Sequence, residues 1–129
     1  MNLDLEELKY ILSESVEPLP AWDSHEKLSP PYRDKFDLEL VKRTNPKSAS
    51  VLILLYQNEN GEIEFPVTMR VSYDGAHSHQ FSLPGGQFEE QDISFDETAI
   101  RETVEELGVE YENIEIIKQL SEIYIPPSN

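Results

Sequence analysis

The chain of 129 residues contains no cysteine, which excludes disulfides, thiolate zinc sites and a cysteine nucleophile. Its longest apolar run covers only residues 51–56, far short of the roughly 20 residues that a membrane-spanning helix needs. Basic residues are also scarce, because 10 Lys and Arg stand against 26 Asp and Glu, a net charge of −16. Such a chain repels the phosphate backbone. We therefore expect no nucleic-acid partner and no membrane span.

The first residues, MNLDLEELKY, are acidic and lack the basic and then apolar order of a secretory signal. We therefore expect a cytoplasmic protein. A hydrophobic content of 38% with 28% charged residues is typical of a folded globular protein. The length suffices for one compact domain but not for two full enzyme domains.

The chain divides at about residue 48. Apolar residues recur at helical spacing near the start of the chain and predict a short helix there (Leu5, Leu8, Ile11 and Leu12). Residues 18–36 hold four of the nine prolines, which predicts an irregular segment. We therefore expect residues 1–48 to form an N-terminal helix and a proline-rich arm, and residues 49–129 to form the main domain.

Residues 49–57, ASVLILLYQ, are almost continuously apolar and predict a strand buried on both faces. The turn signal Asn60-Gly61 leads into a second strand, 62–71, in which Pro66 indicates an edge or a bulge. A third, short strand ends at Pro84-Gly85-Gly86.

The clearest element is a helix over residues 94–107. Ser94 is suited to cap it and Glu97 to complete a capping box, while Gly108 is suited to end it in the left-handed conformation. Two isoleucine-rich segments, 114–117 and 123–125, predict further strands. This order of elements predicts the α/β class, with a helix packed on a mixed sheet.

This helix carries a candidate metal site. At 100° per residue, Glu102, Glu105 and Glu106 share one face, and apolar residues take the opposite face (Ile100, Val104 and Leu107). Like charges one turn apart destabilise a helix, so a cation should compensate. Carboxylates without cysteine suit Mg²⁺ or Mn²⁺, and Arg101 beside them can orient one carboxylate. A plain solvated face of glutamates would show the same pattern.

The residues before the helix favour the metal site, because the two glycines let the backbone approach a ligand and their carbonyls are hard oxygen donors. Residues 86–109, GQFEEQDISFDETAIRETVEELGV, resemble the Nudix box, G-x5-E-x7-R-E-U-x-E-E-x-G-U. The match is close from Arg101 to Val109, with Thr103 in place of a bulky apolar residue. The loop is one residue longer than the common form, and Asp92 is the candidate for the role of its glutamate.

Residues 68–86, TMRVSYDGAHSHQFSLPGG, resemble the signature of the coenzyme A pyrophosphatase branch, T-x-R-S-x3-R-x-H-x-G-Q-x-S-F-P-G-G. The agreement covers Thr68, Arg70, His77, Gln80, Ser82 and Pro84 to Gly86. The chain departs from the signature at Val71, Gly75, His79 and Leu83, which weakens the expectation of tight substrate contacts.

The resemblance implies a Nudix-type α/β/α sandwich with a mixed sheet, of which the C-terminal part is missing here. It implies metal-dependent hydrolysis of a substrate that contains a linked nucleoside diphosphate. For the coenzyme A branch, the products are adenosine 3′,5′-bisphosphate and 4′-phosphopantetheine.

The implied roles are as follows. Glu102 and Glu106, with the Gly86 carbonyl, hold Mg²⁺ or Mn²⁺, and Glu105 and Arg101 are the catalytic candidates. Substrate contacts fall to residues of the upstream signature (Arg70, His77, Gln80 and Ser82). Gln80 and Ser82 alternate along a strand and so face one side, but ordinary strand polarity would look the same, and His77 would also suit a hydrogen-bonded loop.

Two alternatives stay open at this point. One is a Nudix-like nucleotide-binding or regulatory module without turnover, and the other is an acidic interaction domain. The apolar strand 49–57 needs cover on both faces, and one helix covers only one of them. Further residues beyond position 129, the N-terminal arm or a second copy could supply this cover. Of these, we expect a homo-oligomer in which a second chain covers the open sheet face.

Overall fold

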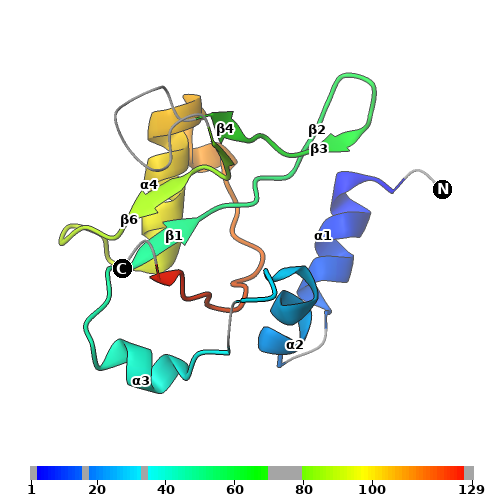
Figure 1. Cartoon of the computed structure of the whole chain (residues 1–129). Helices are drawn as coiled ribbons and strands as arrows, with labels where there is room; N and C mark the ends of the chain where they lie inside the picture. The colour runs from blue at the N-terminus through cyan, green and yellow to red at the C-terminus, as the bar shows by residue number, and fades with distance from the viewer. Residues whose placement is uncertain (1–2, 16–17, 33–34, 70–79, 127–129) are drawn as a thin grey trace.

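The computed structural model describes residues 3–15, 18–32, 35–69 and 80–126. Figure 1 shows an N-terminal arm of short helices beside a domain in which one long helix packs on strands. The helices are α1 (Leu5–Ser13), α2 (Trp22–His25), α3 (Leu38–Lys42) and α4 (Phe95–Leu107), with 3₁₀ turns at Glu26–Leu28 and Tyr111–Asn113. The strands are β1 (Ala49–Val51), β2 (Tyr56–Gln57), β3 (Ile63–Glu64), β4 (Thr68–Met69), β5 (Phe81–Ser82) and β6 (Gly85–Gln87). The predicted α/β class is confirmed.

The described strands form three antiparallel pairs, β1 with β6, β2 with β3, and β4 with β5. In the first pair, Ser50 lies opposite Gly86 and Val51 opposite Gly85. Two flanking hydrogen bonds of 2.9 Å extend it, from Leu52 N–H to the Pro84 carbonyl and from Phe88 N–H to the Ser48 carbonyl. The double glycine is therefore part of a strand and not only a turn.

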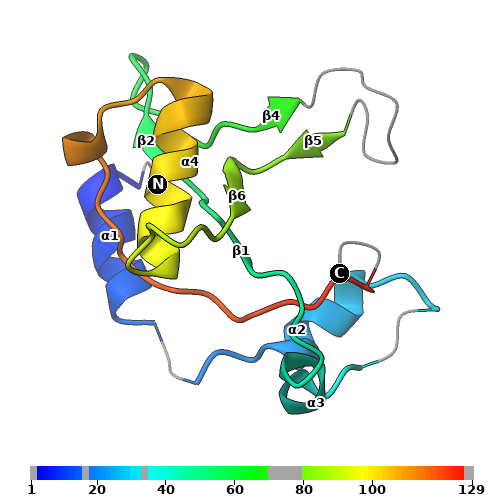
Figure 2. The same cartoon turned by 90° about the vertical axis from the view of Figure 1, so that its left-hand side faces the viewer.

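Helix α4 packs on this pair, beside β1 and β6 in both Figure 1 and Figure 2. Its predicted ends are confirmed, because the Ser94 hydroxyl accepts from Glu97 N–H and Gly108 closes the helix at a φ of 69°. The capping box is only half formed. The Glu97 carboxylate accepts from Ile93 N–H, one residue before the cap.

The buried face of α4 differs from the prediction. Its fully buried residues are Thr98, Ala99, Ile100 and Thr103, whereas Val104 and Leu107 are only half-buried. Small side chains at these positions let the helix lie close to a strand whose glycines carry no side chain. Thr103, the departure from the Nudix pattern, is thus one of the most buried residues described.

The predicted strands are shorter and more exposed in the structure. Residues 52–55 interrupt the predicted strand 49–57, and Val51 and Ile53 are exposed, so burial on both faces is wrong. Pro66 separates β3 from β4 because it cannot donate to a ladder. The segments 114–117 and 123–125 form no strand. The expected mixed sheet is therefore seen only as short antiparallel pairs within the described residues.

The arm packs on the segment that follows α4, which runs past α1 toward α2 and α3 in both ribbon views (Figures 1 and 2). Lys9 Nζ lies 2.6 Å from Glu115 Oε2, and Lys42 Nζ lies 3.1 Å from Glu122 Oε2. The rings of Phe36 and Tyr124 meet edge to face with centroids 5.0 Å apart. No helix among the described residues is long and apolar enough to cross a membrane.

Gly85 provides a test of this packing. A Cβ there would lie 2.3 Å from the Ser50 carbonyl oxygen and 2.6 Å from Val51 Cα, both backbone atoms. We expect Gly85→Ala to lower the free energy of unfolding by about 2 kcal/mol or more, because β1 must shift. Urea denaturation measures this difference.

Gly108→Ala is the matched control, since a Cβ there meets nothing within 4 Å and only the positive φ is strained. It should cost about 1 kcal/mol. An effect of Gly85→Ala no larger than that of Gly108→Ala would contradict the close approach.

Candidate functional site

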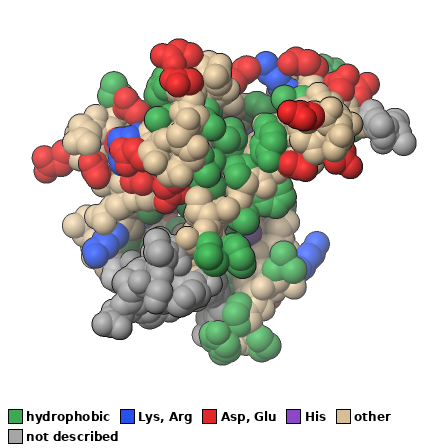
Figure 3. All heavy atoms as spheres, turned by 90° about the horizontal axis from the view of Figure 1, so that it is seen from above, with side chains coloured by type: hydrophobic (Ala, Val, Ile, Leu, Met, Phe, Trp, Pro, Cys, Tyr) green, Lys and Arg blue, Asp and Glu red, His purple; other side chains and the backbone are tan. Residues whose placement is uncertain are grey.

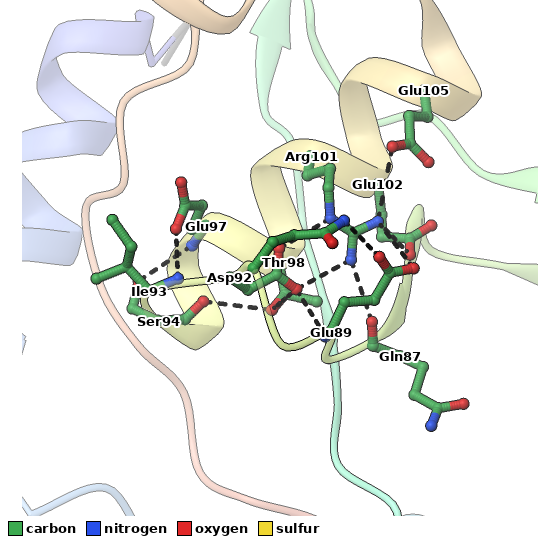
Figure 4. Close-up of polar contacts among 11 residues, drawn as sticks. Gln87, Glu89, Asp92, Ile93, Ser94, Glu97, Thr98, Arg101, Glu102 and Glu105 are labelled. Atoms are coloured by element: carbon green, nitrogen blue, oxygen red, sulfur yellow. Dashed lines mark hydrogen bonds and ion pairs between the residues drawn. The ribbon is translucent and has the colours of Figure 1, made fainter.

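The candidate site is built around the guanidinium group of Arg101, on the second turn of α4 (Figure 4). Arg101 Nε donates to Asp92 Oδ1 at 2.9 Å and Nη2 donates to Asp92 Oδ2 at 3.0 Å, a bidentate ion pair. Nη2 also donates to the Gln87 carbonyl at 3.1 Å. The loop before α4, the end of β6 and the helix are therefore joined through one side chain.

The Asp92 carboxylate is almost completely enclosed, with 1% of its side chain exposed. Besides Arg101, it accepts from Glu89 N–H and from the Thr98 hydroxyl, both at 2.9 Å. The hydrogen bonds from Arg101, followed by those from Glu89 and Thr98, hold the pKa of Asp92 well below its usual range, although burial opposes them. Asp92 therefore stays ionised inside the fold.

The remaining nitrogen of the guanidinium faces the helix glutamates. Arg101 Nη1 donates to Glu102 Oε1 at 2.9 Å and lies 3.6 Å from Glu105 Oε1. Glu89 Oε1, from the loop, lies 3.9 Å away. The hydrogen bonds from Arg101 to Asp92 and Glu102 raise the pKa of Arg101 above its already high value, so the guanidinium is permanently charged. The geometry thus makes Arg101 an orienting group for carboxylates.

The carboxylates of Glu102 and Glu106 lie against the backbone of the double glycine. A Cβ on Gly86 would lie 2.3 Å from the Glu102 carboxyl carbon, so the carboxylate occupies the space that a side chain at 86 would fill. Glu106 Oε2 accepts from Gly85 N–H at 3.2 Å. Glu102 is thus half-buried against β6, whereas the sequence predicts it on the face opposite the core. Glu105, with 59% of its side chain exposed, points away from the strand.

These donors suit a hard divalent cation, because Glu102, Glu106 and the backbone of Gly86 offer only oxygens beside a strand without side chains. Among residues 3–15, 18–32, 35–69 and 80–126, no group of three or more His, Asp or Glu side chains converges as a metal site. The contacts explain this, since Arg101 holds Glu102 and Gly85 N–H holds Glu106.

The predicted substrate residues are only partly described. Ser82 lies on β5, opposite Thr68 of β4, and their hydroxyl oxygens are 3.2 Å apart. Gln80 is exposed just before β5. Arg70 and His77 lie outside the described residues. The structure therefore places Ser82 and Gln80 on the chain that leads into Gly85-Gly86.

The sequence reasoning missed three contributors to the site: the Thr98 hydroxyl, the Gln87 carbonyl and the Glu89 backbone. A backbone group carries no sequence signal. Thr98 does carry a sequence signal, because a β-branched residue has a lower helix propensity than alanine and its presence in the helix suggests another role.

A groove of about 730 Å³ lies elsewhere, between the arm and residues 122–124. Trp22, Phe36 and Tyr124 line it, and no predicted site residue does.

Comparison with known proteins identifies the domain. The model of the NUDIX domain family matches residues 46–129, well over half of the chain. No solved structure matches.

Two relatives come from Arabidopsis thaliana. Nudix hydrolase 15, mitochondrial, is 38% identical over 78 residues, which are 60% of this chain and 27% of that protein. Nudix hydrolase 22, chloroplastic, is 39% identical over 75 residues, which are 58% of this chain and 25% of that protein. The chain thus spans only about a quarter of the length of these relatives.

The Asp92 ion pair predicts how stability depends on pH. The folded pKa of Asp92 lies below the unfolded value of about 3.9. Its contribution is therefore complete above that value and is lost as the pH falls through the folded pKa. We expect the difference in unfolding free energy between wild type and Asp92→Asn to shrink as the pH is lowered from about 6 to 3.

Denaturant titrations across this range measure the difference. Asp96→Asn, which removes an exposed carboxylate in the first turn of α4, is the control for the change in net charge. A constant difference for Asp92→Asn, or the same profile for both variants, would show that Asp92 is not held ionised by the fold.

Proposed function

Because the chain belongs to the Nudix family, we propose that it hydrolyses substrates in which a nucleoside diphosphate is linked to another group, with Mg²⁺ or Mn²⁺ as cofactor. The observation that carries this proposal is the position of the Glu102 and Glu106 carboxylates against Gly85-Gly86. Helix packing holds both there, with Arg101 donating to Glu102 and Gly85 N–H donating to Glu106.

Each residue has a defined part in this reaction. Glu102 and Glu106, with the Gly86 carbonyl, would hold the cation, which neutralises phosphate charge and activates water. The Glu105 side chain is exposed, so its carboxylate can complete the set of metal ligands or accept a proton from the attacking water. Arg101 donates to Glu102 and lies 3.6 Å from Glu105. Its role is to orient Glu102 and offset the charge of the carboxylates.

For the substrate, we propose coenzyme A or one of its derivatives, cleaved into adenosine 3′,5′-bisphosphate and 4′-phosphopantetheine. Support comes from the signature residues between Thr68 and Gly86. Ser82 and Gln80 lead directly into the glycine strand, where a diphosphate would meet the carboxylates. The net charge of −16 makes a bridging cation necessary for so anionic a ligand.

The assay compares coenzyme A, acyl-coenzyme A, NADH and nucleotide sugars as substrates, each with Mg²⁺, with Mn²⁺ and with chelator. We expect cation-dependent release of adenosine 3′,5′-bisphosphate from coenzyme A. If only another of these diphosphates were hydrolysed, that compound and not coenzyme A would be the substrate. Binding without turnover of any of them would indicate a nucleotide-binding module.

Glu106→Gln tests the metal ligands within this assay. The carboxylate is exposed, so the fold should survive, while turnover should fall by at least about tenfold because a charged ligand is lost. Glu110→Gln, an exposed change just beyond α4, should keep wild-type activity. Near wild-type turnover of Glu106→Gln at saturating Mg²⁺ would remove Glu106 from the site.

Gln80→Ala tests the substrate side. We expect KM to rise about tenfold, the loss typical of one good polar contact, with Mn²⁺ affinity unchanged. Fluorescence or spin-resonance titration measures the Mn²⁺ affinity and steady-state kinetics the KM. Equal losses of both would indicate damage to the fold instead of a lost contact.

We further propose that a second copy of the chain covers the open sheet face. Met69 and Phe81 are cross-strand partners with exposed fractions of 59% and 72%, and Val51 and Ile53 are also exposed. Figure 3 shows apolar side chains in the middle of one face with acidic side chains at its edges. Apolar side chains exposed together on one face are typical of a surface that another chain covers.

Sedimentation velocity tests this association. We expect a concentration-dependent dimer that Phe81→Glu converts to monomer, because the change places charge on the apolar face. A wild-type chain that remains monomeric at high concentration would overturn the idea.

A further inference from the structure

Two threonines on α4 are completely buried, and their hydroxyl groups behave differently. The Thr103 hydroxyl donates to the Ala99 carbonyl one turn earlier, at 2.7 Å. This is the usual way for a helical threonine to satisfy its own polar group. The Thr98 hydroxyl has the equivalent acceptor, the Ser94 carbonyl, but at 3.2 Å. Its shorter bond, 2.9 Å, goes to Asp92 Oδ2.

The Thr98 hydroxyl therefore contacts the carboxylate that anchors Arg101. Asp92 holds two edge nitrogens of the guanidinium, and this leaves Nη1 directed at Glu102 (Figure 4). These hydrogen bonds form a series that begins at the fully buried hydroxyl of Thr98. It ends at the Glu102 carboxylate, which lies against Gly86. Each link is a hydrogen bond of 3.0 Å or less, and three of the four members (Thr98, Arg101 and Glu102) lie within about one turn of the same helix.

We propose that Thr98 is a positioning residue for the site. Its hydroxyl fixes Asp92, Asp92 fixes Arg101, and Arg101 holds the Glu102 carboxylate against β6. This inference deepens the proposed function and rests on it only for the metal-ligand role of Glu102. Such outer contacts matter because a ligand that must be oriented on each binding event binds its cation more weakly.

The test uses the full chain with Thr98→Val, which replaces the hydroxyl with a methyl group of similar shape. Thr98→Ser restores the hydroxyl, and Thr103→Val removes an equally buried hydroxyl that does not contact Asp92. Mn²⁺ affinity is measured by spin resonance. The Arg101 Nε–H signal is followed by NMR without metal and assigned from its absence in Arg101→Lys.

We expect Thr98→Val to raise the Mn²⁺ dissociation constant about tenfold and to shift the Arg101 signal with faster proton exchange. Thr98→Ser and Thr103→Val should keep both properties close to wild type, even if they melt earlier. Should Thr98→Val not fold, Thr98→Ala removes the hydroxyl without setting a methyl group against the carboxylate.

Two outcomes overturn the proposal: a Thr98→Val variant with wild-type Mn²⁺ affinity and Arg101 signal, or equal effects of Thr98→Val and Thr103→Val. A wild-type chain that binds no Mn²⁺ contradicts the proposed function instead. In that case the Arg101 signal alone decides whether Thr98 positions the guanidinium.

Discussion

The ion pair between Arg101 and Asp92 is the interaction on which the geometry of the site depends. Asp92 lies in the loop between β6 and α4, and Arg101 lies in the second turn of the helix, so their pairing fixes the loop against the helix. It also leaves a single guanidinium nitrogen to face the acidic residues. A lysine could not replace it, because the point charge of an ammonium cannot grip one carboxylate with two parallel bonds and orient another.

The distribution of charge along the chain explains why one arginine has such a large role. Residues 49–129 carry 16 acidic and 3 basic residues, a net charge of −13, whereas residues 1–48 have a net charge of −3. Among the described residues of the domain, the basic side chains are Arg101 and Lys118, and Lys118 bonds to Ser15 of the arm. Within the part of the domain that the structure describes, Arg101 is thus the one basic side chain beside the carboxylates of α4, and a bound cation would supply further positive charge there.

The sequence predicted α4 closely, because its ends depend on local signals at Ser94 and Gly108. It also indicated Arg101 and the glutamates, whose spacing is a property of the helix itself. The strands were predicted too long. Apolar content indicates a strand but not how far its hydrogen-bonded pairing extends, and Pro66 interrupts that pairing between the end of β3 and the start of β4. The buried face of α4 was misjudged because hydrophobicity alone selects Val104 and Leu107. Close packing on the glycine strand instead favours the small Ala99 and Thr103.

The contacts between the arm and the segment after α4 join residues that are more than 100 positions apart, such as Lys9 with Glu115 and Ser15 with Lys118. Contacts between residues so far apart in the sequence close a long loop, which costs conformational entropy. Exposed ion pairs contribute little free energy to offset that cost. By contrast, α4, β1 and β6 share close-packed backbone. We therefore expect separation of the arm from the segment after α4 to cost less free energy than separation of α4 from the glycine strand.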